Sequence, residues 1–474
     1  MLFQSAGTLQ IRKWKEKDQA IDEIRPHFPI DNFFNKTDKS PTGFMVREPQ
    51  PENNDRRGAT ISSFLKDRFF YGWVITGAGI VISIMGFGAR YSFGIFLKAL
   101  EADFGLSRGA TSSIFSVYML ICCFMSILGG WALDRYDARK VAFAMGTFTG
   151  LSLLLTSRAG EVWQLFITYS LLLSLGTGAI FTVVNTTASR WFVRKRGLVV
   201  GITSSGGGLG VIAVAPLATF LVSTFNWRIA FVVLGSVAWF FMGSASLVLR
   251  KDPRDMGLFP DGAEPAPSKN GSLKKKPDPQ SGEGLSLKQA AHTSQFWVIG
   301  AVWVLLSLTL HLVFVHLVPY AVDMGISPMD AAFILSIIGL ANIIGRLIIG
   351  RLSDSMDRKR LGTVCAFIQF VSFLWLLYAG ELWMFYAFAI VYGFLWGGTS
   401  IVVTTLLGDI YGMRSLGIIM GGVNAGWSLG AATGPVLGGV LFDLYGHYSS
   451  AFAAGAGAIL VATLLLATIR KAPK

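Results

Sequence analysis

The sequence predicts an all-α polytopic membrane protein with twelve transmembrane helices in two six-helix, pseudo-symmetric bundles. Three observations predict this class. Of the 474 residues, 52% are apolar and only 15% are charged, a composition too apolar for an ordinary globular enzyme. Apolar segments of about 20 residues, the length that crosses a bilayer, follow one another from Tyr71 onward. The second half of the chain also repeats features of the first.

Residues 1–69 precede the first apolar segment and differ from it in composition. They are polar, carry charges of both signs and contain five prolines between Pro26 and Pro51. Segments of this kind bury too little apolar surface to offset the entropy of folding. We expect a disordered cytoplasmic N-terminal extension.

The predicted spans form two groups separated by a linker. Residues 70–250 should form the N-terminal six-helix bundle and residues 295–470 the C-terminal one. Residues 251–294 form a cytoplasmic linker that is rich in Pro, Gly and Lys and cannot lie in the membrane. The spans lie near residues 71–98, 110–133, 141–157, 162–190, 198–223, 228–250, 295–320, 329–352, 361–379, 382–408, 416–441 and 449–470.

The formal net charge of +13 comes from basic residues that gather in alternate loops, so it implies no nucleic-acid partner. The positive-inside rule places the basic loops in the cytoplasm. We therefore expect an integral protein of the plasma (inner) membrane with both termini cytoplasmic. The basic side holds Arg135, Arg139, Lys140, residues 194–196, eight Lys and Arg residues from Arg250 to Lys288, and residues 358–360; the other side holds little beyond Lys98, Arg108, Arg158 and Arg228.

An internal repeat relates the two halves at an offset of 220 residues. The loop sequence DFGLS recurs as DMGIS, and EVW recurs as ELW. Such loop matches indicate duplication more strongly than single glycines do. The matched positions include Asp103, Gly105, Ser107, Gly130 and Asp134, which recur as Asp323, Gly325, Ser327, Gly350 and Asp354.

Asn342 and Arg346 lie inside an otherwise apolar segment and are four residues apart, so on a helix they project from one face. Arg346 lies roughly 12 Å inward from Asp354 along a helix. A charge at that depth needs a cavity, a counter-ion or a ligand. We interpret Arg346 as an anion-binding residue; the alternative is an arginine that snorkels or braces neighbouring helices. The equivalent position of the first half is Ser126.

Two charged loops follow the second and eighth spans, at residues 130–140 and 350–360. They resemble the two copies of the cytoplasmic loop signature of the major facilitator superfamily. The resemblance implies that Gly130 and Gly350 allow close helix approach, and that two aspartates latch the cytoplasmic side against a helix end or a basic residue. Asp137 departs from the signature, where glycine is usual. The gating residues that the resemblance implies are Gly130, Asp134, Arg135, Arg139, Gly350, Asp354 and Arg358.

Within that superfamily the chain resembles the monocarboxylate transporters and the oxalate:formate antiporter group. The resemblance rests on residues 89–108, 190–201, 316–327 and the eighth span. It implies that the substrate arginine falls on Arg346, with Asn342 one turn earlier. Animal monocarboxylate transporters have an aspartate at the position of Asn342, and asparagine cannot titrate. His311 and His316 are therefore the candidates for proton coupling, although either histidine could be structural.

The number of cations in the pathway bears on the substrate. The eleventh span contains no Lys or Arg, unlike the oxalate:formate antiporters, so the single Arg346 suits one carboxylate. Arg90 in the first span would allow dianions if it faces Arg346, and would merely attract anions if it lies near the outer end. Tyr91, Tyr118 and Asn424 are further candidates for the pathway; hydrogen bonds between helices would explain them equally well.

These features predict a secondary transporter of a small organic monocarboxylate, such as lactate or pyruvate, that works by alternating access with proton coupling. The alternatives are an exchanger of dicarboxylates or other anions, drug efflux, and a transporter-like receptor or sensor. We expect no enzyme activity, no cofactor and no metal, because no catalytic set, Walker motif or metal-ligand spacing is present. The expected partners are a small organic anion, a proton or counter-anion, and the lipid bilayer. The run at residues 204–210 lies within an apolar helix and predicts close helix packing.

Overall fold

The computed structural model describes residues 70–192, 195–262, 285–412 and 416–469, and these are almost entirely helical. The predicted N-terminal extension and the central part of the linker lie outside the described residues. In chain order the helices of the first half are α3 (Gly72–Tyr91), α4 (Phe93–Phe104), α5 (Arg108–Arg135), α6 (Ala138–Thr156), α7 (Val162–Leu165), a π-helical turn (Phe166–Leu172), α8 (Leu173–Thr177), α9 (Ile180–Trp191), α10 (Arg196–Thr224) and α11 (Trp227–Val248).

A short helix, α12 (Leu287–Ala291), precedes the second half of the chain. The long helices that follow are α13 (Ser294–Asp323), α14 (Pro328–Ser355), α15 (Arg358–Leu376), α16 (Leu382–Tyr411), α17 (Leu416–Tyr445) and α18 (Ser449–Thr468). No strand occurs in the part of the chain that the structure describes, which confirms the all-α prediction for that part.

Eleven helical segments of the described ranges are long and apolar enough to cross a membrane. The first combines α3 and α4, and the third runs from α7 through α9. The remaining predicted span corresponds to α6, a helix of 19 residues. It is not among the eleven; Arg139 and Lys140 lie in its first turn, and three of its residues are threonine. The helices therefore agree closely with the twelve spans predicted.

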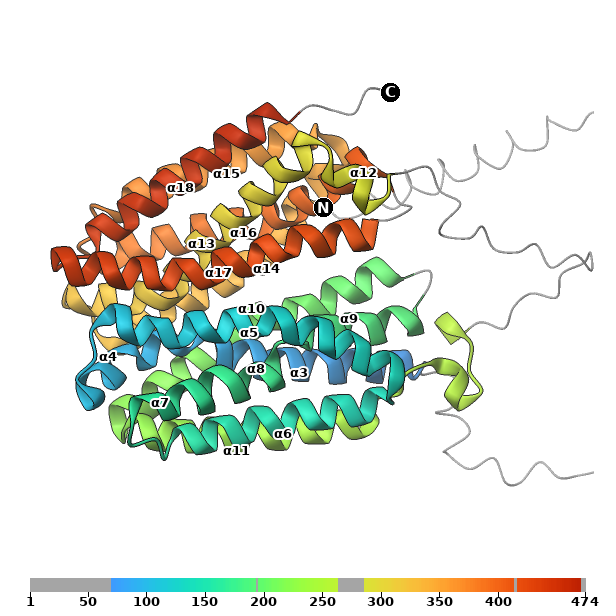
Figure 1. Ribbon diagram of the computed structural model, residues 1–474, viewed down its shortest axis with the longest axis horizontal. Coiled ribbons are helices and arrows are strands. Elements are labelled where there is room, and N and C mark those ends of the chain that lie inside the picture. Colours follow the sequence, from blue (N-terminus) through green and yellow to red (C-terminus); the bar gives the residue numbers. More distant parts are fainter. Residues whose placement is uncertain (1–69, 193–194, 263–284, 413–415, 470–474) are drawn as a thin grey trace, which may run out of the picture. The chain divides into compact units, whose positions relative to one another are not determined.

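The helices before residue 250 and those after residue 285 form two groups that face each other (Figure 1). The most extensive contacts between the groups join α5 to α17 and α10 to α14, and α4 also packs on α13. The α10–α14 crossing depends on glycine. A Cβ atom at Gly208 would lie 2.7 Å from the Gly339 carbonyl oxygen, and one at Gly339 would lie 2.8 Å from that of Gly208. This crossing confirms the packing role predicted for the small-residue run in α10.

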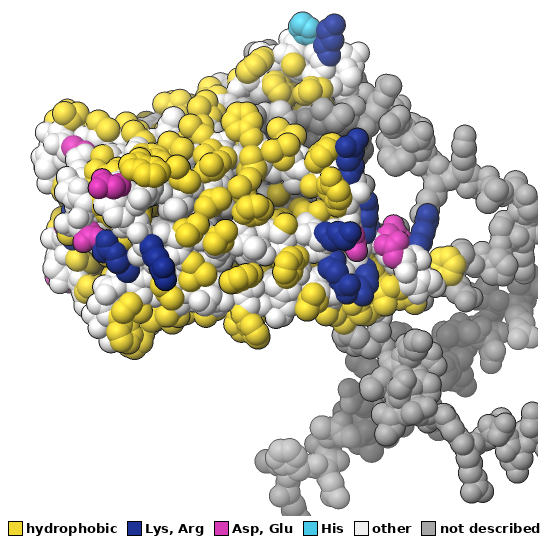
Figure 2. All heavy atoms as spheres, turned by 60° about the horizontal axis from the view of Figure 1, so that its bottom comes forward, with side chains coloured by type: hydrophobic (Ala, Val, Ile, Leu, Met, Phe, Trp, Pro, Cys, Tyr) yellow, Lys and Arg dark blue, Asp and Glu magenta, His cyan; other side chains and the backbone are white. Residues whose placement is uncertain are grey.

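Large apolar side chains cover the outer surface of the helices. Figure 2 shows them over the middle of one face, with charged side chains gathered towards its two ends. Phe124, Ile127, Phe240 and Leu347 are 65–71% exposed. Exposed apolar surface of this extent is expected where lipid rather than water surrounds the protein.

Candidate functional site

The first membrane span has a local irregularity at Ser92, where α3 ends at Tyr91 and α4 begins at Phe93. Ser92 lies between the two helices. Its backbone N–H donates to the Gly88 carbonyl oxygen at 3.1 Å, and its hydroxyl donates to the Ala89 carbonyl oxygen at 3.2 Å. Arg90 and Tyr91 therefore immediately precede a slight distortion of an otherwise continuous membrane span.

Arg90 and Tyr118, two predicted pathway residues, are in contact. Arg90 Nε donates to the Tyr118 hydroxyl at 2.9 Å, and Nη2 lies 3.7 Å from Cys122 Sγ. The Thr177 hydroxyl donates to the Leu173 carbonyl oxygen at 2.8 Å, so the Tyr118 hydroxyl donates to Thr177 Oγ1 at 2.6 Å. Tyr118 thus accepts from Arg90 and holds it in place. No carboxylate of the described residues forms an ion pair with Arg90.

Arg346 is half-buried on α14, with its guanidinium carbon 5.8 Å from the centre of the Trp396 ring. Its Nε has no hydrogen-bond partner, and neither does Nδ2 of Asn342 or Nε1 of Trp396. Asn342 is only 4% exposed. No carboxylate among the described side chains pairs with Arg346. Three buried N–H donors from two helices are left unmatched at one place, which is costly unless a ligand accepts from them.

Tyr91 lies within electrostatic range of both Arg90 and Arg346. Its ring stacks on Phe314 of α13, with the ring centres 4.4 Å apart, and Phe314 in turn lies 6.3 Å from the Trp396 ring. The two halves thus meet at an aromatic lining with one guanidinium from each. We call Arg90, Tyr91, Asn342, Arg346 and Trp396 the central site.

The two candidate coupling histidines have different surroundings. His311 lies beside the central site, with its ring centre 6.2 Å from that of Tyr91. His316 lies further along α13, where Nε2 donates to the Pro435 carbonyl oxygen at 2.7 Å and Nδ1 lies 3.2 Å from the Tyr448 hydroxyl. Both nitrogens of His316 are therefore engaged. Asn424, the remaining candidate, lies on α17, and its side chain is outside the described residues.

The loop motif of the first half lies at the end of the helices where the described chain begins (Figure 1). Arg139 donates through Nε and Nη2 to the Leu247 carbonyl oxygen, at 2.9 and 2.5 Å. The guanidinium of Arg135 lies over the Trp131 ring at 5.1 Å. Both contacts stay within the first half.

The second copy of the motif lies at the same end. Arg358 donates to Asp409 at 2.5 Å and to the Ser353 carbonyl oxygen at 3.2 Å, within the second half. The side chains of Asp134 and Asp354 lie outside the described residues. At Gly130 and Gly350 an added Cβ would make only ordinary contacts, at 3.5 and 3.4 Å. The contacts described for these motif residues thus lie within one half or the other.

At the opposite end of the helices, charged residues form contacts that join the two halves and close this end. Lys98 Nζ lies 2.6 Å from Asp323 Oδ1, and Arg108 Nη1 lies 2.7 Å from Asp323 Oδ2. The backbone N–H groups of Arg108 and Gly109 donate to Asp443 at 3.0 and 2.8 Å. These two N–H groups belong to the first two residues of α5, and the helix dipole stabilises a carboxylate at that end of a helix. We call Lys98, Arg108, Asp323 and Asp443 the closing cluster.

Glycines allow the backbones to approach at this closed end. A Cβ at Gly94 would lie 2.6 Å from the carbonyl oxygens of both Phe314 and Val315, and one at Gly439 would lie 2.7 Å from the Arg108 carbonyl oxygen. Both glycines face backbone of the other half. The structure is therefore closed at this end and joined there by charge and by direct packing.

The closing cluster is not predicted from the sequence, in which Lys98 and Arg108 stand out only as loop charges. The internal repeat nevertheless indicates that Asp323 pairs differently from Asp103. Asp103 pairs with Arg228 of its own half at 2.6 Å. The corresponding turn of the second half, residues 446–452, contains no arginine. Asp323, the repeat partner of Asp103, therefore has no cation there and pairs with the first half.

Replacing Asp323 with asparagine is expected to weaken the closed end. The change removes the only carboxylate of the second half that pairs with Lys98 and Arg108 among the described ion pairs, and leaves Arg108 with Glu101 of its own half. Partly exposed ion pairs are worth about 1 kcal/mol, or about fivefold in an equilibrium. The measurement is the reaction of a Ser112→Cys probe with a membrane-impermeant maleimide, because Ser112 is fully buried and its hydroxyl lies 3.4 Å from His316 Nε2 of the other half. Labelling should become several-fold faster. Asp103→Asn is the matched control, and equal labelling in the two variants would contradict the assignment.

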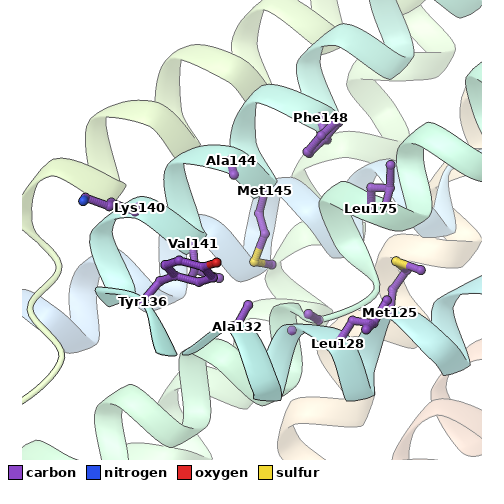
Figure 3. A pocket seen from close by; sticks show the side chains of 12 residues that line it. Met125, Leu128, Ala132, Tyr136, Lys140, Val141, Ala144, Met145, Phe148 and Leu175 are labelled. Atoms are coloured by element: carbon purple, nitrogen blue, oxygen red, sulfur yellow. The ribbon is translucent and has the colours of Figure 1, made fainter. Parts of the chain in front are cut away.

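A separate cavity of about 290 Å³ lies in the first half, among α5, α6 and α8 (Figure 3). Its wall is apolar apart from Tyr136 and Lys140 at one end. None of its lining residues belongs to the central site, and we assign it no role. The lining residues are Met125, Leu128, Gly129, Ala132, Tyr136, Lys140, Val141, Ala144, Met145, Phe148, Leu175 and Ala179.

The described residues thus form two groups of apolar helices of membrane-spanning length, the architecture of a polytopic α-helical membrane protein. The family model described as Major Facilitator Superfamily matches residues 78–419 and 320–474. The chain belongs to this superfamily, a family of transporters and not of enzymes, as the sequence predicted.

Curated relatives are similar over most of their length. The chain is 26% identical to monocarboxylate transporter 12-B of Danio rerio, covering 84% of this chain and 87% of the relative. It is 27% identical to monocarboxylate transporter 11 of Homo sapiens, covering 82% and 81%. It is also 24% identical to the uncharacterized MFS-type transporter YhjX of Escherichia coli (strain K12), covering 75% and 85%.

Solved structures share the fold. A bacterial homologue of the human lysosomal transporter Spinster, in an inward-facing and unoccupied conformation, aligns with a TM-score of 0.63 at 14% identity. The alignment covers 84% of this chain and 95% of that structure. At this identity the likeness concerns the fold alone.

Proposed function

We propose that this chain is a secondary transporter of a small organic monocarboxylate such as lactate or pyruvate. One observation carries the proposal. Arg346 lies within a membrane helix without a carboxylate partner among the described residues, and unmatched N–H groups of Asn342 and Trp396 accompany it. A substrate carboxylate would accept from these donors through charge-assisted hydrogen bonds. The similarity to relatives named monocarboxylate transporters supports the same substrate class.

Transport would proceed by alternating access, with the two six-helix halves rocking about the central site. We place both termini and the linker in the cytoplasm, because the loops at that end carry most of the basic residues. The closing cluster then forms an outer gate, and the loop motifs around Asp134 and Asp354 form the inner one. The structure would correspond to a conformation closed towards the outside of the plasma membrane.

Proton coupling is part of the proposal, since a monocarboxylate that crosses together with a proton carries no net charge. Asn342 cannot bind that proton. Of the two candidate histidines, His311 lies beside the central site, whereas both nitrogens of His316 are engaged in other contacts.

The test is uptake of labelled L-lactate and pyruvate by purified protein in liposomes. We expect uptake of at least one acid to rise several-fold when the outside is made acidic, and to be inhibited by unlabelled acid. Empty liposomes provide the background. Absence of uptake of either acid under any imposed gradient would rule the proposal out.

Arg90 favours a second candidate function, exchange of dicarboxylates. It too lacks a carboxylate partner among the described residues, and it shares Tyr91 with Arg346. For this function oxalate should compete with labelled substrate, uptake should be stimulated by oxalate on the opposite side, and Arg90→Gln should weaken that competition by about tenfold, the loss of one charged hydrogen bond. Arg158→Gln, at an exposed residue, is the control. No oxalate competition in the wild type would exclude exchange.

A further inference from the structure

His311 has an unpartnered nitrogen beside the central site. Its side chain is fully buried, and Nε2 has no hydrogen-bond partner. The rings of Tyr91 and Trp427 lie 6.2 and 5.8 Å from it, centre to centre. Buried polar atoms in folded proteins nearly always have a partner. An unmatched nitrogen next to a ligand site therefore points to a group on the ligand.

The other nitrogen of the ring determines which one carries hydrogen. Nδ1 lies 2.8 Å from the Ser307 carbonyl oxygen, and a carbonyl only accepts, so Nδ1 must be the donor. The Ser307 hydroxyl does not alter this, because it donates to the Trp427 carbonyl oxygen at 2.6 Å. In a neutral imidazole one nitrogen donates and the other accepts. Nε2 of neutral His311 therefore presents a lone pair.

The unmatched atoms around the aromatic lining thus differ in kind. Arg346 Nε, Asn342 Nδ2 and Trp396 Nε1 are all donors, which suits a carboxylate. Nε2 of His311 is an acceptor. Tyr91 lies near both sets, since its ring centre is 6.2 Å from that of His311 and it is within electrostatic range of Arg346. A ligand that satisfies both sets has a carboxylate and, close to it, a hydrogen-bond donor.

We propose that His311 Nε2 accepts a hydrogen bond from a hydroxyl of the transported acid, so that the chain selects 2-hydroxy acids over 2-oxo acids. This inference rests on the proposed carboxylate transport. A 2-hydroxyl group has a hydrogen to donate to Nε2. A 2-oxo group has only lone pairs, which would be repelled by the lone pair of Nε2. An acid with neither group would leave Nε2 without a hydrogen-bond partner.

The test measures how well unlabelled L-lactate, pyruvate and propionate inhibit uptake of labelled L-lactate into liposomes. For the wild type, lactate should inhibit at about tenfold lower concentration than the other two, because a site built for a substrate hydroxyl discriminates against analogues that lack it. His311→Phe removes the acceptor but keeps a ring, and should bring the three acids within about twofold. His311→Gln, whose amide oxygen can accept, should keep part of the preference. His292→Phe, the same change at an exposed histidine, should leave the ratio unchanged.

Several results would overturn the inference. One is a wild type that transports pyruvate or propionate as well as lactate, and another is a preference that survives in His311→Phe. A third is loss of the proton-gradient dependence in His311→Phe with the preference intact, which would make the ring the proton carrier. Uptake of none of the acids by the wild type would instead refute the proposed function, and this inference with it. If His311→Phe fails to fold, a partial loss of the preference in His311→Gln with unchanged melting temperature supports the inference, and an unchanged preference refutes it.

Discussion

Replacing Arg346 with alanine is expected to reduce carboxylate uptake by at least about thirtyfold. Losing one member of a buried, hydrogen-bonded charge pair costs about 2–5 kcal/mol, and Arg346 is the only cation of the second half among the residues we place at the central site. Asn342 and Trp396 would still donate to the substrate, but both are neutral. The measurement is the initial rate of labelled L-lactate uptake, with the amount of folded protein determined for each variant.

Substituting lysine for Arg346 distinguishes the effect of the positive charge on uptake from that of the guanidinium geometry. Arg346→Lys keeps the charge but loses the planar fork that binds both carboxylate oxygens, so its uptake should lie well below wild type and above that of alanine. Ser126→Ala, at the repeat-equivalent position of the first half, is the matched control. Its hydroxyl contacts Thr182 Oγ1 at 3.0 Å and not the central site, so uptake should stay within about twofold. Undiminished uptake in Arg346→Ala would show that Arg346 does not bind the substrate and only stabilises the packing of neighbouring helices.

The helices could be predicted from the sequence because membrane spans have a strong signal in length and hydropathy. The local irregularity at Ser92 could not, because residues 71–98 read as one continuous apolar span. Nor could the π-helical turn at Phe166–Leu172 within the fourth predicted span. Such interruptions depend on contacts with other helices, and no local residue pattern marks either of them.

The central site could be predicted in part. The spacing of Asn342 and Arg346 placed both on one face of a helix, and a charge inside a membrane segment needs an explanation wherever it occurs. Trp396 was missed, because tryptophan is unremarkable in an apolar helix and its unmatched N–H is evident only once α16 packs on α14. For the same reason the difference between His311 and His316 depends on Ser307, Pro435 and Tyr448, which only the fold brings near them.

Replacing Gly94 with valine is expected to stop transport while leaving substrate binding largely intact. In the closed conformation a Cβ at Gly94 would lie 2.6 Å from the carbonyl oxygens of Phe314 and Val315. These are backbone atoms of α13, which cannot rotate aside as a flexible side chain would, and overpacking of this kind costs about 1–3 kcal/mol or more. The closed conformation should therefore be disfavoured by at least about tenfold. Uptake should fall accordingly, since alternating access requires both conformations.

Two measurements distinguish a blocked closure from a damaged protein. L-lactate should still raise the melting temperature of Gly94→Val, because Arg346, Asn342 and Trp396 are untouched. The Ser112→Cys probe, in a protein whose three native cysteines are replaced by serine, should react faster with the impermeant maleimide than in the Gly94 parent. Gly77→Val is the matched control, because on the same membrane span a Cβ at Gly77 has no atom within 4 Å. A Gly94→Val variant with normal uptake and a protected probe would show that α4 and α13 need not approach for the outer side to close.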